Sequence, residues 1–469
     1  MTDDLHRLSA SALADAYARG ELSPVDVTRA VIAQIERREP VLHALYAFDP
    51  DAALDQARAS EARWRAGAPL SAIDGVPGTL KENLASRGHA MPMGSAATLL
   101  QPLDRDAPPA ARWREAGLVL LAKTTMPDYG MLSSGLSSLH PLARNPWDTR
   151  MTPGGSSAGA GAAAAAGYGP LHVGTDIGGS IRLPAGWCGL VGFKPSAGRV
   201  PIRPPYTGRV AGPMTRSVRD AAWLMGVLSR PDTAEARDPT GLPYQAIAWQ
   251  QLDRGLRGLR IGLQLDAGWG LPVSPDTRAA VCAAARSFEA AGAIVEPLAP
   301  FTTRAMIDGL DRFWRMRSWV DLQALPPERR DLVLPYIRDW VASAAGFSAV
   351  ELYHGHAQMA AIRDATLAAC EPFDAVLSPT SPVPAFAADW ASPVNDPQRP
   401  FEHIAFTLPY NMSEQPAVSL HCGLTGDGLP IGLQIAGRRH DDLGVLQLAA
   451  ACEALRGGMP AWPMDDTGR

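Results

Sequence analysis

The sequence is nearly empty of lysine. It holds 43 basic residues, of which only Lys81, Lys123 and Lys194 are lysines and the other 40 (43 − 3) are arginines. An arginine side chain keeps its proton in proteins, whereas a desolvated lysine can lose it. The three lysines are therefore candidates for positions that need an amine rather than a positive charge. The alternative is that a few lysines survive by chance.

Cysteine is also scarce, and its placing argues against two kinds of structure. The five cysteines are an odd number, lie scattered along the chain and form no C-x-x-C pair. This pattern disfavours a disulfide framework and a zinc site, and it favours buried thiols in a reducing cytoplasm. The pair His354 and His356 has no clear third metal ligand. We expect no metal and no cofactor.

Long apolar runs and an excess of positive charge are missing as well. The N-terminus, MTDDLHRLSASALADAY, has no apolar secretion signal, and no run is long enough to span a bilayer. The net charge of −5 gives no indication of nucleic-acid binding. With 46% apolar and 19% charged residues, the composition is typical of a globular protein. We expect a cytoplasmic protein with no nucleic-acid or membrane partner.

Helix and strand patterns alternate along the chain. Ser23 and Ser274 each precede a proline, and serine caps a helix N-terminus while proline suits its first turn. Short apolar runs such as 118–122 are typical of buried strands. The alternation predicts an α/β fold. Helices are predicted at 23–38, 51–65, 217–228 and 274–291 and through 304–370, and strands at 118–122, 259–263, 292–295, 375–377 and 432–435.

Three glycine-rich segments hold the candidate chemistry. GVPGTLKEN (75–83) carries Lys81, PGGSSAG (153–159) carries Ser156 and Ser157, and GTDIGGS (174–180) carries Ser180. Glycines before a serine let successive backbone N–H groups point at one place, as an oxyanion hole requires. The alternative is a tight turn with a structural serine.

These segments contain no histidine, so a serine in them needs another base. A buried lysine with a lowered pKa can take the proton, and a second serine can relay it, because a hydroxyl both donates and accepts. GSSAG also matches the G-x-S-x-G elbow of Ser-His-Asp hydrolases, with Ser157 as nucleophile and His403, His421 and His440 downstream. That elbow needs a strand directly before the serine, which TRMTP does not predict.

Taken together, the motifs resemble the amidase signature family. The resemblance rests on GGSS, on the 24-residue step from Ser156 to Ser180, on DIGGSIR and CGLVGFKPSAGRVP, and on Lys81, which lies 75 residues before Ser156. KTTMP, RNPWD, GPMTRSVRDAA and DGLPIGLQIAG extend it over most of the chain. It implies a large central mixed β-sheet covered by helices on both faces. It also implies one domain over 1–469, with N-terminal helices over 1–67, a core over about 72–225 and a C-terminal part over 258–469.

By position, the resemblance implies a Ser-cisSer-Lys triad. Ser180 is the expected nucleophile, Ser156 the bridging serine after a cis peptide bond, and Lys81 the base that starts neutral. The remaining expected site residues support this triad: Ile177, Gly178 and Gly179 with the Ser180 amide as the oxyanion hole, Ser157 beside Lys81, and an ion pair of Asp176 and Arg182. Ala158 and Glu82 depart from the family pattern, which affects local packing but removes no catalytic atom.

The same resemblance places the substrate against Met126–Ser133. Tyr129, Gly130 and Met131 are the expected contacts, and they carry no fixed charge. This favours a neutral aryl or alkyl amide, unless Arg209 or another arginine in 199–209 points inward.

The implied reaction is hydrolysis of a carboxylic amide C–N bond through an acyl-enzyme, and the same chemistry suits carbamates (urethanes) and esters. The partner is then a small-molecule amide or carbamate, and the protein a monomer or homodimer. The alternatives are an amidotransferase A-type subunit that releases ammonia for a partner, a Ser-His-Asp α/β-hydrolase, and a non-catalytic binding protein.

Overall fold

The strands of the described residues form one mixed sheet. The structure is a computed structural model that describes residues 4–231, 241–457 and 462–463. Along the sheet the order is β1-β3-β2-β4-β6-β5-β10-β11-β9-β7-β8. The strands are β1 (Leu45–Tyr46), β2 (Pro77–Lys81), β3 (Val119–Thr124), β4 (Leu171–Asp176), β5 (Val191–Lys194), β6 (Val210–Thr215), β7 (Arg260–Leu263), β8 (Ile294–Pro297), β9 (Ala375–Pro379), β10 (Ala417–Leu424) and β11 (Pro430–Gly437).

Parallel and antiparallel pairs are mixed in this sheet. β2 runs parallel to both β3 and β4, and β7 runs parallel to both β8 and β9. The pairs between these two parallel groups, from β4 to β9, are antiparallel, as is β1 with β3. The predicted α/β class with a large mixed sheet is confirmed.

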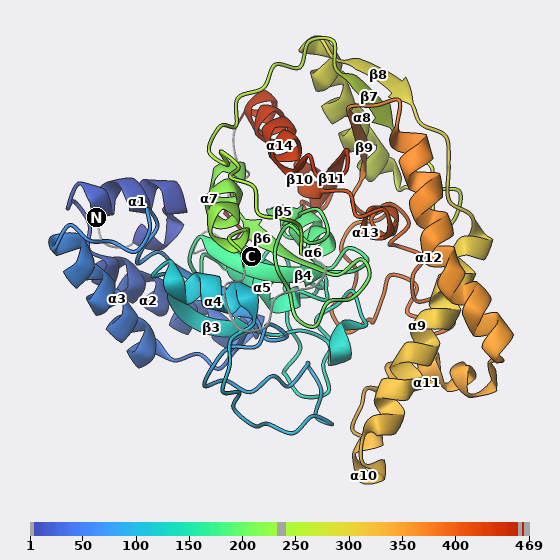
Figure 1. Cartoon of the computed structure of the whole chain (residues 1–469), viewed down its shortest axis with the longest axis horizontal. Coiled ribbons are helices and arrows are strands. Elements are labelled where there is room, and N and C mark those ends of the chain that lie inside the picture. Colours follow the sequence, from blue (N-terminus) through green and yellow to red (C-terminus); the bar gives the residue numbers. More distant parts are fainter. Residues whose placement is uncertain (1–3, 232–240, 458–461, 464–469) are drawn as a thin grey trace.

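Helices cover both faces of the sheet (Figure 1). Along β3 and the residue before it, Leu118 and Leu120 belong to one hydrophobic core, whereas Val119 and Leu121 belong to another, because alternate side chains of a strand point to opposite faces. The first core joins α1, α4, α7, α8 and α14 to the sheet, and the second joins α2, α3 and α5. The short helix α6 packs beside α5.

Two of the predicted helices begin where serine and proline place their starts. Ser23 and Ser274 accept hydrogen bonds from the first turns of α2 and α8, as predicted. The helices are α1 (Ala10–Ala18), α2 (Pro24–Leu42), α3 (Pro50–Arg65), α4 (Pro108–Glu115), α5 (Ala158–Ala166), α6 (Arg182–Trp187), α7 (Val218–Leu228), α8 (Pro275–Ala290), α9 (Arg304–Ala324), α10 (Pro327–Arg330), α11 (Pro335–Ala342), α12 (Ala349–Cys370), α13 (Leu408–Met412) and α14 (Asp442–Arg456).

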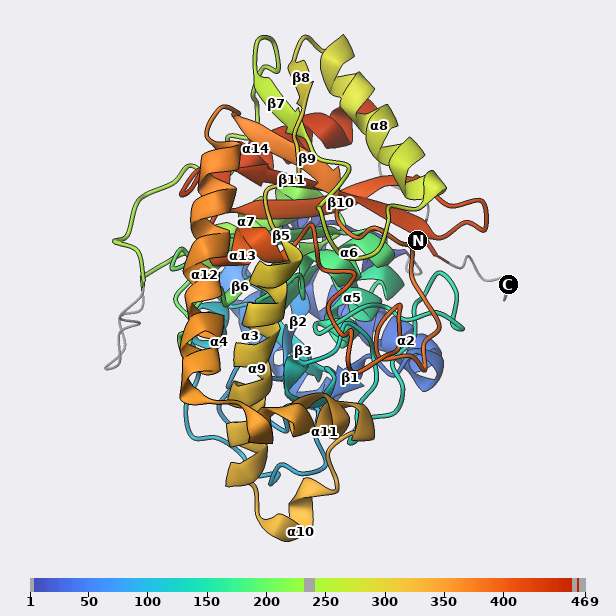
Figure 2. The same ribbon diagram turned by 90° about the vertical axis from the view of Figure 1, so that its right-hand side faces the viewer.

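The helical stretch predicted over 304–370 contains four α-helices. Pro327 and Pro335 stand at the starts of α10 and α11, where proline fits a first turn but cannot continue the helix before it. The long helices α9 and α12 lie side by side along one flank of the molecule (Figure 2). Through Trp314, α9 reaches the cavity described below.

Candidate active site

Two of the serines with expected catalytic roles line one cavity. Ser156 and Ser180 lie on the wall of a cavity of about 570 Å³, which we call the serine cavity. Both side chains are largely buried, with 4% and 9% of their surface exposed. Tyr129, Gly130 and Met131, the substrate contacts expected from the resemblance, form part of the same wall. The glycine-rich segments therefore meet at one place.

Lys81 ends strand β2 behind this wall and is fully buried. Its neighbour Leu80 points into the first core, so the lysine points to the opposite face, toward α5. The Lys81 Nζ lies 2.8 Å from Ser156 Oγ, 3.1 Å from Ser157 Oγ and 3.2 Å from Thr175 Oγ1. The amine therefore has three hydroxyl neighbours within hydrogen-bond distance.

The hydrogens around Lys81 can be assigned from these contacts. Ser157 donates its hydroxyl to the Thr175 carbonyl and accepts from the Thr175 N–H, both at 3.2 Å, so toward Lys81 it can only accept. Thr175 Oγ1 already accepts from Asn83 Nδ2 at 3.0 Å. A neutral amine has two N–H groups and one lone pair. If it donates to Ser157 and Thr175, its lone pair faces Ser156.

The surroundings of Lys81 favour the neutral amine. Burial lowers its pKa well below 10.5, the charge of Arg209 lowers it further, and the carboxylates of Asp176 and Glu82 oppose both effects. Glu82 itself contacts His140, with Oε2 and Nε2 2.8 Å apart. Lys81 therefore has the chemistry of a base rather than of a fixed charge.

The serine pair stands at the start of the buried helix α5. The peptide bond between Gly155 and Ser156 is cis, as expected from the resemblance. All residues of α5 are buried, and its glycines allow close approach of other backbone. A Cβ on Gly159 would lie 2.1 Å from the Ala44 carbonyl oxygen. The small side chains thus let α5 pack directly beneath the site.

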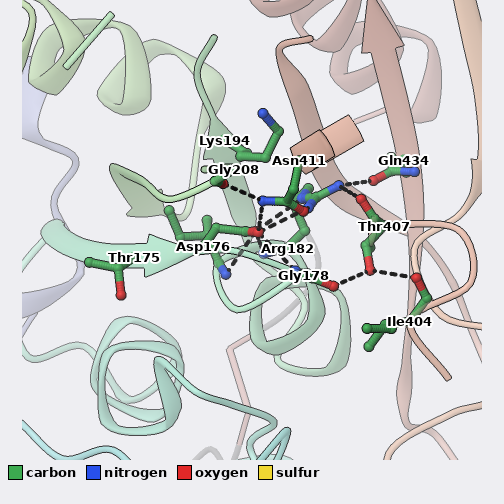
Figure 3. Close-up of polar contacts among 12 residues, drawn as sticks. Thr175, Asp176, Gly178, Arg182, Lys194, Gly208, Ile404, Thr407, Asn411 and Gln434 are labelled. Atoms are coloured by element: carbon green, nitrogen blue, oxygen red, sulfur yellow. Dashed lines mark hydrogen bonds and ion pairs between the residues drawn. The ribbon is translucent and has the colours of Figure 1, made fainter. Parts of the chain in front are cut away.

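Asp176 and Arg182 form the predicted ion pair, and both side chains are fully buried (Figure 3). Arg182 Nη2 lies 2.9 Å from Asp176 Oδ1 and Nε lies 3.0 Å from Oδ2. Burial by itself raises the pKa of Asp176, but the charge and hydrogen bonds of Arg182 outweigh it and hold the pKa below its usual range. The carboxylate also accepts from the N–H groups of Gly179 and Ile181, at 2.8 and 3.1 Å.

One of the donors expected in the oxyanion hole already has a partner within the protein. The N–H of Gly179 is already engaged by Asp176, so that group does not face the cavity as an open donor. Within the described chain, the N–H groups of Ile177, Gly178 and Ser180 donate to no protein acceptor. The backbone around Ser180 therefore offers these three donors, held in place by the carboxylate of Asp176.

Side chains from the C-terminal third complete the support of this loop, and sequence reasoning missed them. Thr407 donates to the Gly178 carbonyl at 2.6 Å (Figure 3). Asn411 donates to Asp176 Oδ1 at 2.8 Å and accepts from Arg182. Gln434 accepts from Arg182 at 2.7 Å. Thr407 and Asn411 lie in none of the motifs quoted above. Gln434 lies in DGLPIGLQIAG, but nothing local connects it to Arg182, 252 positions away.

The serine cavity has charged side chains besides the expected contacts Tyr129, Gly130 and Met131. Arg209, Arg317 and Asp321 all line the serine cavity, among apolar side chains that include Trp314 and Phe401. Arg209 is the arginine of segment 199–209 that lines the cavity among the described residues. Arg317 and Asp321 lie on α9 and carry no sequence signal that connects them to the glycine-rich segments.

The histidine-based alternatives do not fit the geometry. Among the described residues that line the serine cavity there is no histidine. His403 instead stacks against Trp187, and burial lowers its pKa to about 3. His354 and His356 lie on α12 next to aromatic rings, and the described residues contain no cluster able to hold a metal ion.

Known proteins are similar to this chain over most of its length. The family model described as Amidase matches residues 26–446. The chain is 36% identical to the A-type subunit of the glutamyl-tRNA(Gln) amidotransferase of Myxococcus xanthus (strain DK1622), covering 94% of this chain and 96% of the relative. It is 31% identical to an acylamidase of Rhodococcus erythropolis, covering 98% of both.

Solved structures with the same fold include two hydrolases. A bacterial aryl acylamidase of the amidase signature enzymes matches with a TM-score of 0.86 and 29% identity, over 97% of this chain and 99% of that one. A 6-aminohexanoate cyclic dimer hydrolase matches with a TM-score of 0.85 and 26% identity, over 98% and 99%. In the part of the chain that the structure describes, no helix has the length and apolarity needed to cross a membrane.

Proposed function

The chain belongs to the amidase family, and from that premise we propose that it hydrolyses a carboxylic amide C–N bond through Ser180, Ser156 and Lys81. The observation that carries this proposal is the 2.8 Å contact between a buried lysine amine and a serine on the wall of the cavity that also holds Ser180. A lysine with a lowered pKa can act as a base at neutral pH.

The proposed reaction has two halves. Ser180 Oγ attacks the amide carbon while its proton passes to Ser156 Oγ and the proton of Ser156 passes to Lys81 Nζ. The negative oxygen of the tetrahedral intermediate accepts from the backbone N–H groups beside Ser180. The C–N bond breaks as the proton returns along the same path to the amine. Water then attacks the acyl-Ser180 ester by the same relay, releasing the acid and the free enzyme.

The relay is tested by single substitutions assayed on a panel of 4-nitroanilides. Ser180→Ala and Lys81→Ala are expected to lower kcat by about 1,000-fold or more, as for other residues of a catalytic unit. Ser287→Ala is the matched control, because its hydroxyl donates to the Ala283 carbonyl within α8 and Ser287 is not among the described residues that line the serine cavity. Turnover like that of the wild type in either of the first two variants contradicts the proposed roles.

The proposed substrates are aryl or alkyl amides, and carbamates and esters are further candidates. All three classes have a carbonyl that a serine can attack, followed by loss of an amine or alcohol. The aryl acylamidase and acylamidase neighbours support the amide class. The three classes are ranked by the kcat/KM for release of amine or alcohol, measured on an amide, a carbamate and an ester that differ only in the bond that is cleaved.

A second candidate function is that of an amidotransferase A-type subunit. The amidotransferase relative from Myxococcus xanthus, 36% identical, favours it. Such a subunit releases ammonia from glutamine for partner chains. Ammonia release from glutamine, increased by co-purified partner subunits, supports this candidate, whereas rapid anilide hydrolysis by the isolated chain supports the first.

We further propose a cytoplasmic protein that works as a monomer or homodimer on a small-molecule substrate. All five cysteines are free thiols, which supports a reducing compartment.

A further inference from the structure

Two arginines from distant parts of the chain meet in the serine cavity. Arg209 directly precedes β6, and Arg317 lies within α9. The guanidinium carbon of Arg317 lies 4.8 Å from the centre of the Tyr206 ring, so the ring holds this side chain in place. All three residues line the same cavity wall as Ser156 and Ser180.

Most of the hydrogen-bonding capacity of these groups is unused by the protein. Among the described residues neither arginine has a carboxylate within ion-pair distance. Arg317 Nη2 contacts only the sulfur of Met131, at 3.6 Å, and its buried Nε has no partner. The buried hydroxyl of Tyr206 has none either. Arg209 donates to the Pro204 carbonyl at 2.8 Å. A guanidinium presents five N–H donors, so several remain for a ligand.

The two positive charges also disfavour each other. Burial lowers the pKa of Arg209 to about 10, and the charge of Arg317 contributes to the lowering. Two like charges beside a partly apolar cavity are stabilised when an anion binds between them. An arginine pair with unpaired donors is suited to a planar anion with two oxygens.

We propose that Arg209 and Arg317, with the hydroxyl of Tyr206, bind a carboxylate group carried by the substrate. This inference rests on the proposed amide hydrolysis and adds the substrate class: amides whose acyl or amine part bears a carboxylate. The apolar side chains of the cavity contact the segment between that carboxylate and the scissile bond.

Asp321 sets the strength of this site. It lies one helical turn after Arg317 and lines the same cavity. Partial burial raises its pKa, and the charge of Arg317 opposes that rise. Its negative charge offsets part of the positive charge offered by the arginines. Removing the charge of Asp321 therefore strengthens carboxylate binding, whereas removing an arginine weakens it.

The test compares two pairs of substrates that differ only in the carboxylate. Glutaryl-4-nitroanilide against pentanoyl-4-nitroanilide places the charge on the acyl side, and 4-acetamidobenzoate against 4-methylacetanilide places it on the amine side. The expected result is a higher kcat/KM for the carboxylate member of one pair. No preference in either pair overturns the proposal.

Variants then assign the preference to the arginines. Arg317→Gln and Arg209→Gln are expected to reduce the carboxylate-to-neutral ratio of kcat/KM by about 10- to 100-fold, the range for a hydrogen bond to a charged group. Asp321→Asn is expected to raise the ratio. Arg312→Gln is the matched control on the same helix, since Arg312 does not line the cavity. A ratio unchanged in both arginine variants overturns the proposal.

A binding measurement separates this inference from the proposed reaction. The Ser180→Ala variant lacks the nucleophile but keeps both arginines, so calorimetric titration with the same four compounds needs no turnover. Tighter binding of one carboxylate compound, lost when Arg317→Gln is added, supports the carboxylate site even if the triad roles fail. Equal binding of the members of both pairs overturns it even if the triad roles hold.

Discussion

The hydroxyl of Thr407 donates to the carbonyl oxygen of Gly178 at 2.6 Å, across 229 positions of the sequence. This bond connects the segment before α13 to the loop that presents the backbone N–H groups next to Ser180. Thr407 lies fully buried, and its backbone carbonyl also accepts from Arg182 at 2.8 Å. One residue thus holds both the loop and the ion pair beneath it.

Replacing this threonine tests how far loop position controls catalysis. Thr407→Val keeps the shape but removes the donor, so the Gly178 carbonyl loses its partner. We expect kcat to fall by about 10-fold while KM changes less, and the free energy of unfolding to fall by about 1–3 kcal/mol. Thr407→Ser, which retains the hydroxyl, is expected to recover most of kcat. A Thr407→Val enzyme with unchanged kcat argues against loop positioning.

The pH dependence of activity is predicted from the pKa of Lys81. The base must be neutral, so kcat/KM should rise with pH as Lys81 loses its proton, with a midpoint well below 10.5. The charge of Arg209 lowers this pKa, so Arg209→Gln is expected to move the midpoint to higher pH. The rate of Ser180 labelling by a fluorophosphonate measures the midpoint without a substrate carboxylate.

Arg317→Gln is the matched control for that shift. Arg317 lines the same cavity but is not among the groups that shift the pKa of Lys81. Its labelling profile should keep the midpoint of the wild type. Equal movement in both arginine variants, or none in Arg209→Gln, counts against Arg209 as the charge that acts on Lys81.

Gly130 allows the cavity wall to approach Ser156. Its φ of +73° is in the left-handed region, and an added Cβ would lie 3.2 Å from Ser156 Oγ and 3.1 Å from the Met126 methyl carbon. Gly130→Ala should therefore displace Ser156 and lower kcat by more than about 10-fold, beyond the cost of about 1 kcal/mol for the backbone conformation. The assay is anilide hydrolysis together with thermal unfolding.

Gly88→Ala separates these two effects. Gly88 has a similar φ of +85°, yet an added Cβ there would meet nothing within 4 Å. This variant should lose stability through the backbone alone and keep its kcat. If the two variants have equal kcat, crowding of Ser156 is not the cause.

The buried amine of Lys123 should make folding stability depend on pH. Burial lowers its pKa to about 7, whereas the unfolded chain keeps the proton to about pH 10.4. Between these values the unfolded state binds more protons, so the free energy of unfolding rises with pH by about 1.4 kcal/mol per unit from this group. Below about pH 7 Lys123 is protonated in both the folded and the unfolded state, so its contribution to the free energy of unfolding no longer changes with pH.

Lys123→Met removes this contribution. The difference in unfolding free energy between wild type and variant should grow in favour of the wild type from about pH 7.5 to about pH 9.5, as followed by denaturant titration. For Arg65→Met, at an exposed position on α3, the unfolding free energy should change with pH as it does in the wild type. Parallel curves for Lys123→Met and the wild type would mean that Lys123 stays protonated when folded.

The local sequence was enough to predict several features of this protein. Serine and proline at the starts of α2 and α8 predicted those helices, because capping depends only on neighbouring residues. The scarcity of lysine and the glycines around three short segments singled out Lys81, Ser156 and Ser180 before any contact was known. Glycines in these segments let the backbone approach the reacting side chains closely, and this signal too depends only on the local sequence.

The tertiary structure alone decided which distant groups meet these residues. Strand order places β10 beside β5 and β11 beside β10, and Gln434 of β11 thereby lies close to Arg182. The packing of α9 over the cavity adds Arg317 and with it the charge that the sequence did not reveal. The physical reason is that residue periodicity determines which face of a strand or helix is buried, whereas the partner across that face depends on how the whole sheet is ordered.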